Sequence, residues 1–371
     1  MPDGTFPGHR VRLTVGGMVS SYGSRQGGWA ARLVRGPAAR VTNLGLLIAL
    51  LLAFATGIGA DATGTTSGRW VVIAHGIVAM AVVLLVPWKG RVVRRGLRRP
   101  RHTRWLSLLL ATLTATTLLA GIGYTTGLVR TVGGVLGMWI HVAAALALLP
   151  LAVWHVVARR ARPRRADLAR RSLLRAGLFT GAAAGLYLAE TAVVTGAALP
   201  GTHRRFTGSY PTGSFDVAAM PSYSWLDDTT PSVDPGRWRL TVHDGTSTRT
   251  LSLADLSTFD TRVRAVLDCT SGWYAEQDWA GVPVRALLPR TGDARSLYVH
   301  STTGYWIRFP VGDLDRLLLA TTVNGEPLRP GHGFPVRLVA PGRRGFWWVK
   351  WVDRIELSST PWWWQPPFPV T

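Results

Sequence analysis

Cys269 is the only cysteine among the 371 residues, and it lies within the stretch LDCTSGWYAEQDWAGVPV (Leu267–Val284). The apolar run VRAVL comes just before it, so we expect a strand to end there and the thiol to point into the space enclosed by the turn TSGW. A single cysteine is more often a small buried hydrophobe than a reactive group. It also excludes an intrachain disulfide, so any part of the chain outside the cytoplasm must be stable through its core alone.

Histidine is the second residue type that could do chemistry, because three histidines lie within long apolar segments: His75, His141 and His155. Ligating groups are expensive there, so a functional site is the first hypothesis. His141 and His155 are 14 residues apart, which places them on nearly one helix face and about 21 Å apart along the axis. His75 and His141 lie at similar depth, where two neutral imidazoles on facing helices could ligate a haem axially. The alternative is that these histidines form hydrogen bonds to neighbouring helices.

The histidine layout resembles small four-helix membrane cytochromes b, some of which stack two haems on histidines with this spacing. Lys89 stands where the second ligand of an inner haem would be required, and His102 is a poor substitute for it. The resemblance therefore implies one outer b-type haem, with His75 and His141 as its iron ligands.

Five apolar segments are long enough to cross a hydrocarbon core of about 30 Å, which takes about 20 helical residues. Tryptophans lie near their ends at positions 70, 88, 105 and 154, where an amphipathic ring suits the membrane interface. One such helix could be buried in a soluble protein, but five in succession predict a transmembrane bundle. The expected spans are Leu44–Ala60, Trp70–Trp88, Trp105–Tyr124, Val132–Val157 and Leu173–Leu199.

The formal net charge of +22 is concentrated in the same half of the chain. Residues 1–199 hold 24 Lys and Arg against 4 Asp and Glu, whereas residues 200–371 hold 18 against 16. The first half is therefore basic and apolar, and the second has the composition of an ordinary soluble domain.

The basic residues of the first half alternate by loop. Three stretches hold 22 of them: residues 1–40, 89–104 and 159–175. The two intervening loops hold only Arg69 and Arg130. This alternation predicts a cytoplasmic N-terminus and two cytoplasmic basic loops, and an odd number of spans then places the second half outside. A surface for nucleic acid would not alternate in this way, so nucleic acid is not an expected partner.

Paired arginines precede the fifth apolar segment. Arg170 and Arg171 begin RRSLLR, and the weakly hydrophobic run that follows contains Glu190. Paired arginines, leucines and a mild apolar run resemble a twin-arginine export signal, here inside the chain. That route carries domains folded in the cytoplasm, which suits a domain that receives a complex cofactor before export. The alternative is an ordinary positive flank of a membrane span. Cleavage within GAALPG by a peptidase, which would release the domain, is a further possibility.

The second half reads as short strands separated by Gly, Pro, Asp and Ser. The runs RWRLTV, RVRAVLD, SLYVHS and YWIRFP alternate as strands do, whereas LADLSTF and VRALLP predict brief helices. The stretch FPVRLVAPGRRGFWWVKWVDRIELS predicts strand, turn and strand. We therefore expect an α+β domain, mainly β, after an all-α transmembrane bundle of four helices plus a fifth.

Three blocks in residues 210–365 carry a resemblance to a known family. They are CTSGWYAEQDWAGVPVRALL, YVHSTTGYWIRFP and NGEPLRPGHGFPVRLVAPGRRGFWWVKWVDRIELS. In order and spacing they resemble the molybdopterin domain of the sulfite oxidase family. The resemblance implies a Mo-molybdopterin cofactor and makes Cys269 the catalytic residue whose thiolate binds molybdenum.

The resemblance also implies six cofactor-binding residues: Thr303, His332, Arg337, Trp348, Val349 and Lys350. His332 and Arg337 would contact the pterin and its phosphate, and Lys350 would add a second cation. Arginine and lysine donors suit a phosphate dianion. The alternative for the two cations is ion pairing with Asp353 or Glu356.

The sequence departs from sulfite oxidases at the substrate side. Those enzymes have arginines just after the ligand cysteine, whereas Thr270–Tyr274 contains none, so sulfite is a doubtful substrate. Trp362–Trp364 occupy the region that lines the entrance to the metal in the family, which predicts an aromatic vestibule for an uncharged or partly apolar substrate. Arg343 and Arg344 could contact an anion if they face the pocket.

These patterns predict four parts of the chain. Residues 1–40 form a cytoplasmic basic N-terminus, 41–158 a four-helix transmembrane bundle, 159–200 a basic loop with the export motif and fifth helix, and 201–371 an extracytoplasmic molybdopterin domain.

The expected function is a plasma-membrane molybdenum oxidoreductase of sulfite oxidase type that transfers an oxygen atom to or from a small molecule in a two-electron step. Its electrons would pass through the bundle to or from a quinone or a redox protein. Two other classes remain: a sensory protein that keeps the pterin fold without catalysis, and a structural anchor of an electron-transfer complex.

Overall fold

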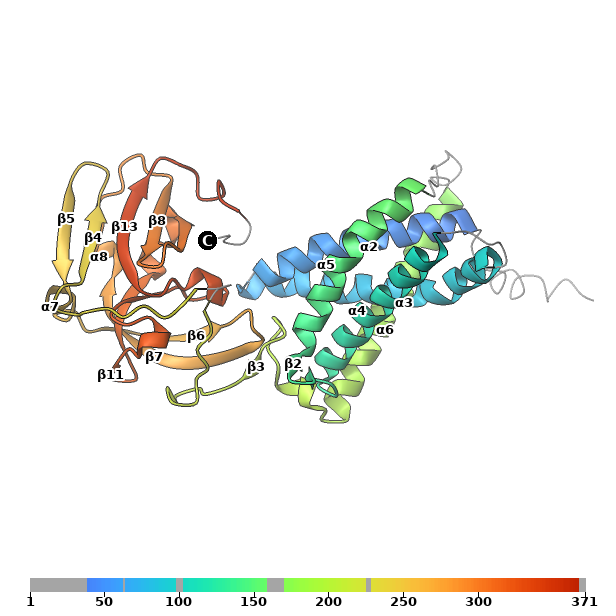
Figure 1. The fold of residues 1–371 in the computed structure, drawn as a ribbon, viewed down its shortest axis with the longest axis horizontal. Coiled ribbons are helices and arrows are strands. Elements are labelled where there is room, and N and C mark those ends of the chain that lie inside the picture. Colours follow the sequence, from blue (N-terminus) through green and yellow to red (C-terminus); the bar gives the residue numbers. More distant parts are fainter. Residues whose placement is uncertain (1–38, 63, 98–102, 159–169, 225–227, 367–371) are drawn as a thin grey trace, which may run out of the picture. The chain divides into compact units, whose positions relative to one another are not determined.

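The computed structural model of the protein describes residues 39–62, 64–97, 103–158, 170–224 and 228–366 (Figure 1). Most of the predicted basic N-terminus, His102 and much of the two basic loops lie outside these ranges.

Five long helices occupy the first half. They are α2 (Ala39–Ala62), α3 (Arg69–Leu97), α4 (Arg104–Thr126), α5 (Gly137–Ala158) and α6 (Arg170–Gly196). Each is long and apolar enough to cross a membrane, which confirms the five predicted helices. Their outward side chains are largely apolar, with Leu119 70% exposed and Leu188 64% exposed. Helices that are apolar all round are typical of membrane spans.

The predicted start of the fourth span is wrong. The fourth span was expected to begin at Val132, but α5 begins at Gly137 because the preceding residues form a hairpin of β1 (Thr131–Val132) and β2 (Val135–Leu136). Its turn is Gly133–Gly134, where both residues have positive φ, a conformation that glycine adopts without a Cβ clash. The apolar content of the hairpin hid this turn from the reading by hydropathy.

The helices pack in pairs. Helix α2 packs on α3, α4 packs on α5, and α6 packs on α3. Leu85 of α3 and Leu148 of α5 are buried between helices.

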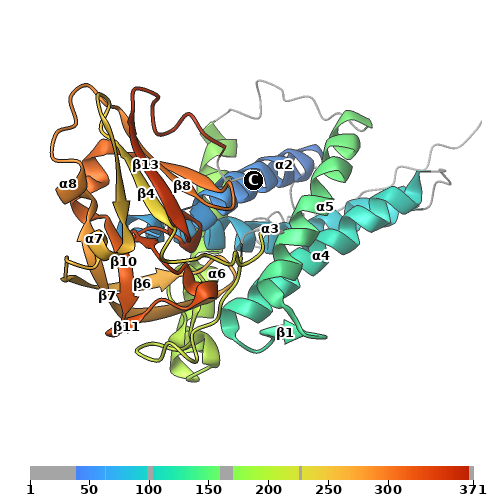
Figure 2. The same cartoon turned by 60° about the vertical axis from the view of Figure 1, so that its left-hand side comes forward.

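Two β-sheets form the second half (Figures 1 and 2). In the six-stranded sheet, β7 is flanked by β6, β3 and β10, and β10 also pairs with β11 and β12. Its strands are β3 (Tyr210–Pro211), β6 (Thr261–Asp268), β7 (Trp273–Pro283), β10 (Leu318–Val323), β11 (Glu326–Pro327) and β12 (Arg337–Val339). The five-stranded sheet has the order β5-β4-β13-β8-β9. Its strands are β4 (Arg239–His243), β5 (Thr248–Ser252), β8 (Ser296–Ser301), β9 (Trp306–Pro310) and β13 (Val352–Ser358).

The mainly β prediction is confirmed. The four predicted runs correspond to β4, β6, β8 and β9, and the two brief helices to α7 (Leu253–Leu256) and α8 (Val284–Leu287). The long central strand β7 was missed, because Glu276 and Asp278 interrupt its apolar pattern on the side that is not buried. The predicted strand, turn and strand of the last block are β12 (Arg337–Val339) and β13 (Val352–Ser358) with a connection between them. This connection includes a 3₁₀ turn, Gly345–Trp347, so the second strand begins only after GFWWVK.

Contacts within the β core bring three loop segments together. Trp279 of β7 and Trp348 are fully buried with ring centroids 5.5 Å apart. An isolated parallel bridge joins Asp268, the last residue of β6, to Arg344. Through these contacts the β6–β7 turn, the start of β12 and the segment after Arg344 converge.

Candidate active site

Cys269 lies at the turn of the β6–β7 hairpin, directly after β6, as predicted. Its N–H donates to the carbonyl of Trp273 (2.9 Å), and the N–H of Gly272 donates to the carbonyl of Cys269 (3.2 Å). Gly272 has φ +88°, which favours glycine. A Cβ at Gly345 would lie 2.9 Å from the Cα of Cys269, so the 3₁₀ turn can approach the cysteine closely only with glycine there.

A cavity of about 500 Å³ contains the thiol side of this turn. Six of the seven predicted site residues line it: Cys269, His332, Arg337, Trp348, Val349 and Lys350. Thr303 does not, and its hydroxyl instead donates to the Asp228 carboxylate (3.0 Å), which itself lines the cavity. The structure thus brings together residues that are up to 81 positions apart in the sequence.

Arg337 is a buried cation that forms no ion pair with a carboxylate of the described residues. Its side chain lies over the faces of Trp279 (5.7 Å) and Trp348 (5.8 Å), and one Nη donates to the carbonyl of His332 (3.0 Å). Its Nε has no hydrogen-bond partner, and within the described part of the chain no carboxylate lies within 4.0 Å of the guanidinium. Burial lowers the pKa of Arg337 to about 10. A buried charge left in this state is costly, so the cavity has the electrostatics of a site for an anion.

Lys350 adds a second positive charge. Its Nζ donates to the carbonyls of Tyr223 (2.8 Å) and Gly331 (2.6 Å). Burial, and secondarily Arg337, lowers the pKa of Lys350 to about 7. The alternative of ion pairing with Asp353 or Glu356 is wrong for Lys350 and Arg337. Asp353 pairs instead with His300 (2.8 Å), and Glu356 forms no ion pair with either cation.

His332 completes the polar side of the cavity. Its Nε2 lies 3.2 Å from the carbonyl of Met220, and its buried Nδ1 has no partner. Burial, followed by the charges of Arg337 and Lys350, lowers the pKa of His332 to about 4. The imidazole is therefore neutral at pH 7 and offers one unused nitrogen.

This donor set fits a molybdopterin. Two cations and an imidazole nitrogen without a partner suit a pterin with a phosphate tail. The thiol of Cys269, a soft ligand, suits a soft metal. The unpaired Nε of Arg337 and Nδ1 of His332 are the observations that a bound anionic group would explain.

Arg343 and Arg344 do not line the cavity, so the predicted anion contact by these arginines is not supported. Arg343 forms an ion pair with Asp313. Arg344 is buried and pairs with Asp268 (2.5 Å), while its Nη2 lies 3.6 Å from Asp61 and 3.4 Å from the carbonyl of Cys269.

The Asp268 carboxylate stabilises the cysteine turn, and the sequence analysis missed this role. It accepts hydrogen bonds from Ser209 (2.6 Å), Thr207 (2.7 Å), Arg205 (3.1 Å) and Arg344 (2.5 Å). A carboxylate held by four donors fixes the residue that precedes Cys269. The signal available in the sequence was an acidic residue that directly follows the apolar run VRAVL and precedes Cys269.

The aromatic vestibule is made by other residues than predicted. Trp362–Trp364 are exposed and do not line the cavity of Cys269. Its aromatic lining comes from Trp139, Tyr223, Trp273, Tyr305, Phe346, Trp348 and Trp351.

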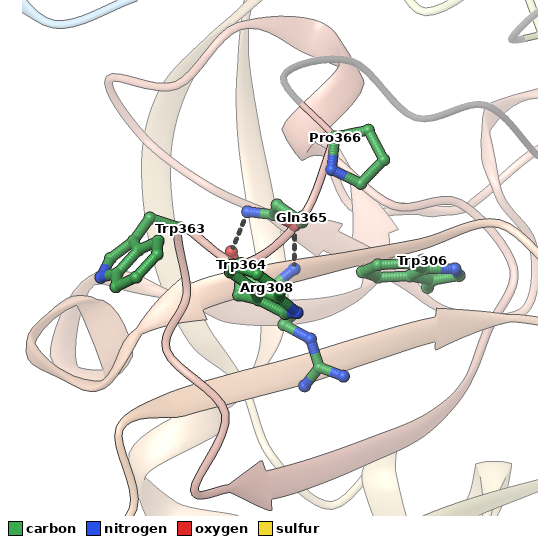
Figure 3. Close-up of a pocket in the computed structure, with 6 residues that line it drawn as sticks. All are labelled: Trp306, Arg308, Trp363, Trp364, Gln365 and Pro366. Atoms are coloured by element: carbon green, nitrogen blue, oxygen red, sulfur yellow. Dashed lines mark hydrogen bonds between the residues drawn. The ribbon is translucent and has the colours of Figure 1, made fainter.

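Two of the C-terminal tryptophans line a separate hollow of about 650 Å³ (Figure 3). Trp363, Trp364 and Trp306 surround Arg308, and the Gln365 side chain bonds both the N–H (2.8 Å) and the carbonyl (2.9 Å) of Arg308. Gln365 thus covers the open edge of β9. Its lining residues, as far as the described part of the chain shows, include no thiol, carboxylate or imidazole.

His75 and His141 meet in the helical half, as predicted. Their ring centroids are 6.1 Å apart and the rings are perpendicular (87°). This separation is close to the roughly 6 Å that results when nitrogen–metal bonds of about 2 Å join two imidazoles to one metal. The Nδ1 of His75 lies 3.0 Å from the carbonyl of Ala53, and that of His141 lies 2.7 Å from the carbonyl of Thr117.

These hydrogen bonds agree with both readings of the pair, because ligating histidines commonly donate their other nitrogen to a carbonyl. His155 does not join the pair, and Lys89 donates to the Asn43 side chain (2.9 Å). The helical half therefore contains one facing histidine pair among its described residues.

The comparisons with known proteins concern the second half. Residues 227–364 match the family model described as the oxidoreductase molybdopterin binding domain. The chain is 39% identical over 96 residues to nitrate reductase [NADPH] of Phytophthora infestans, covering 22% of this chain and 10% of that protein. It is 30% identical over 166 residues to mitochondrial sulfite oxidase of Rattus norvegicus, covering 35% and 30%.

Among solved structures, the sulfane dehydrogenase SoxCD from Paracoccus pantotrophus is 27% identical over 35% of this chain and 40% of that chain, with a TM-score of 0.33. The chain spans less than a third of the length of the two curated relatives. The matched region contains all seven predicted molybdopterin-site residues and does not extend into the five helices. The second half of the chain therefore carries a molybdopterin oxidoreductase domain with homologues among the sulfite oxidases and nitrate reductases.

Proposed function

We propose that the protein is a membrane-anchored molybdenum–molybdopterin oxidoreductase that transfers an oxygen atom in a two-electron step outside the cytoplasmic membrane. The observation that carries this proposal is the cavity in which the only thiol, Cys269, lies with the buried and uncompensated Arg337. The match of this region to the molybdopterin-binding domain supports it.

The cavity residues divide the work of holding the cofactor. The Cys269 thiolate would bind molybdenum, and Arg337, Lys350 and His332 would hold the pterin and its phosphate. When bound, the molybdenum centre supplies reversible two-electron oxygen exchange. The buried pair of Asp268 and Arg344 keeps the cysteine turn in place, and the aromatic rings keep bulk water from the reacting atoms.

The lining favours an uncharged substrate. Arg343 and Arg344 are committed to Asp313 and Asp268, and the turn after Cys269 contributes Thr270, Ser271 and Trp273 to the wall. Among the described residues that line the cavity, a small anion such as sulfite or nitrate would find no cation beyond the two assigned to the cofactor. We therefore favour reduction of an organic oxide, such as an oxidised thioether, over oxidation of sulfite.

The helical half would carry electrons. His75 and His141 lie at a distance that suits one haem between them, and a haem there would exchange single electrons with a quinone or a redox protein. The distribution of cations supports a cytoplasmic N-terminus and an outer C-terminal domain. Arg170 and Arg171 begin α6, where a twin-arginine signal would lie.

Analysis of the protein purified from membranes tests this function. We expect about one molybdenum per chain and a reduced-minus-oxidised haem spectrum. Absence of molybdenum from protein made in a cofactor-competent host would favour the sensory alternative. Haem without molybdenum would favour the structural anchor, and molybdenum without haem would retain the enzyme but remove the electron route through His75 and His141.

Location is tested separately. A reporter enzyme that works only outside the cytoplasm is fused after residue 371 and should be active in the parent protein. Changing Arg170 and Arg171 to Lys should abolish export of the domain and hence the reporter activity. Export that persists in this variant would remove the twin-arginine route, and a cytoplasmic reporter in the parent would contradict the orientation.

A further inference from the structure

One wall of the Cys269 cavity belongs to the helical half. Trp139 and Val142 of α5 line the same cavity as the cysteine. The two are three residues apart, so they lie on one face of the helix. Trp139 belongs to the first turn of α5 and is 49% exposed. A helix long and apolar enough to cross a membrane therefore contributes directly to the site of the β domain.

A buried contact holds this corner of the bundle against the cysteine turn. The hydroxyl of Tyr124, at the end of α4, donates to the carbonyl of Gly272 (3.2 Å), and the hydroxyl of Tyr210 donates to the carbonyl of Tyr124 (2.7 Å). Tyr124 is fully buried, and a Cβ at Gly272 would lie 2.5 Å from its hydroxyl. The end of α4, on which α5 packs, is therefore held against the cysteine turn by close packing.

Polar contacts hold the same junction on two further sides. Arg344 reaches from Asp268 (2.5 Å) to Asp61 at the end of α2 (3.6 Å). The Nε of Arg204 donates to the carbonyl of Thr125 in α4 (2.9 Å). These contacts consequently hold the wall that α5 contributes to the cavity in place.

We propose that Trp139, supported by Val142, is a specificity-determining residue of the proposed oxygen-transfer reaction. Its indole forms an apolar wall beside the reaction space, and contact with such a wall stabilises a substrate in proportion to the apolar area that it covers. The wall favours an organic oxide with a large apolar substituent over a small one. This inference rests on the proposed function and names its substrate class.

The reaction used for the test is balanced as follows. A sulfoxide takes up two electrons and two protons, its sulfur–oxygen bond breaks, and a thioether and one water are formed. Reduced benzyl viologen supplies the electrons, one from each of two molecules.

The first experiment compares two probes of different size in the full-length molybdenum-loaded protein: dimethyl sulfoxide and methyl phenyl sulfoxide. We expect Trp139→Ala to lower kcat/KM for methyl phenyl sulfoxide by roughly tenfold or more, mainly through KM, and to change that for dimethyl sulfoxide by less than about twofold. Trp105→Ala is the matched control, because Trp105 is an exposed tryptophan (62%) in the first turn of α4 that does not line the cavity. Equal effects on both probes would overturn the specificity role.

The second experiment needs no turnover, because Cys269 is the only cysteine of the chain. In full-length protein purified without cofactor, alkylation of Cys269 by iodoacetamide and by the bulkier N-phenylmaleimide reports access to the cavity. We expect Trp139→Ala to raise the maleimide rate several-fold relative to the iodoacetamide rate, and Trp105→Ala to leave the ratio unchanged. An unchanged ratio in Trp139→Ala would show that the indole is no wall of the cavity.

The two experiments separate this inference from the proposed function. Parent protein that contains no molybdenum and reduces neither probe contradicts the proposed function, while the alkylation ratio still decides the role of Trp139 in the cavity. Parent protein that is active and insensitive to Trp139→Ala contradicts only the inference.

Discussion

The Cys269 cavity and the His75–His141 pair are both expected to hold a metal, yet they present opposite states of polar satisfaction. In the cavity, Arg337 Nε and His332 Nδ1 are buried without partners. In the bundle, the Nδ1 atoms of both histidines are already hydrogen-bonded to backbone carbonyls. An unpaired buried cation destabilises the folded chain until an anion binds, whereas a satisfied imidazole pair is stable with or without iron.

Different features of the two sites therefore indicate a ligand. In the cavity, the indication is the unfavourable free energy of buried polar atoms that lack partners. In the bundle, it is only the position of two imidazoles whose centroids lie 6.1 Å apart among apolar helices.

The largest effect is expected for Cys269→Ser. Loss of the thiolate should reduce molybdenum-dependent turnover by more than about a hundredfold, since changes one shell further from a metal already cost roughly 10–100-fold. The change should leave the circular dichroism of the domain intact. The control is Ser271→Ala, which removes only the hydroxyl 3.0 Å from the sulfur and should keep most activity. Turnover at the parental rate in Cys269→Ser would remove the thiolate from the mechanism.

The next effect concerns buried charge and compares Arg337 with Arg344. Arg337→Met should lower molybdenum content but stabilise the cofactor-free domain by about 1–3 kcal/mol, because an uncompensated buried charge is removed. Arg344→Met should destabilise the domain by about 1–3 kcal/mol, because it removes one of the two arginines that donate to the buried Asp268 and leaves only Arg205. Molybdenum content and the thermal midpoint of the cofactor-free protein measure both. Destabilisation by Arg337→Met would contradict the idea that the cavity is charged in anticipation of an anion.

The third effect is confined to the bundle. His75→Leu and His141→Leu should each abolish the haem band and leave the molybdenum content unchanged, because the two sites use different side chains. His155→Leu should keep the band, since His155 does not join the facing pair. Retention of the haem spectrum in either of the first two variants would reject this pair as axial ligands.

The smallest effect is a pH dependence from Lys350. Its pKa is lowered to about 7 in the cofactor-free protein, and a bound phosphate would raise it again. Cofactor affinity should therefore be highest below pH 7 and fall as the pH rises above 7, by at most about tenfold per pH unit. Molybdenum retained after dialysis at pH 6, 8 and 9 measures this fall.

The stability of the cofactor-free domain should change in the opposite direction. Between pH 7 and 10.5 the folded Lys350 has lost its proton while the unfolded lysine, with its ordinary pKa of 10.5, still holds one. Stability should consequently rise with pH across this interval. Lys350→Arg keeps its charge at every pH used and should flatten both curves, and a flat curve in the parent would show that Lys350 titrates elsewhere.

Much of the fold was readable from local pattern. The five apolar runs predict five helices because a span needs about 20 residues of one character, and the alternation in RWRLTV or SLYVHS predicts strands because side chains alternate between faces. The failures have the same origin. The hairpin before Gly137 is as apolar as a helix end, and β7 carries Glu276 and Asp278 on its less buried face, so neither is distinguished by a short window.

The sequence likewise predicted some residues of the candidate site and missed others. Cys269, Arg337 and Lys350 were found because they lie in sequence blocks with a known resemblance. The Asp268 cluster was missed, since its partners Arg205, Ser209 and Arg344 lie at least 59 residues from it in sequence. The aromatic lining was assigned to Trp362–Trp364, but the packing of the C-terminal segment places two of these tryptophans beside Arg308 in a different hollow.

By itself, the amino-acid sequence determined the division into an apolar basic half and a balanced β half, and it determined which residue types could bind a metal or a phosphate. Composition, charge and residue type depend on residues that are neighbours in the sequence, so they can be read without knowledge of tertiary contacts. The three-dimensional packing was needed to show that, among the described residues, Arg344 pairs with a carboxylate and Arg337 with none, and that Trp139 of a helix lines the cavity of Cys269. Charge compensation and cavity walls depend on distances between residues far apart in the chain, and those distances are set by packing.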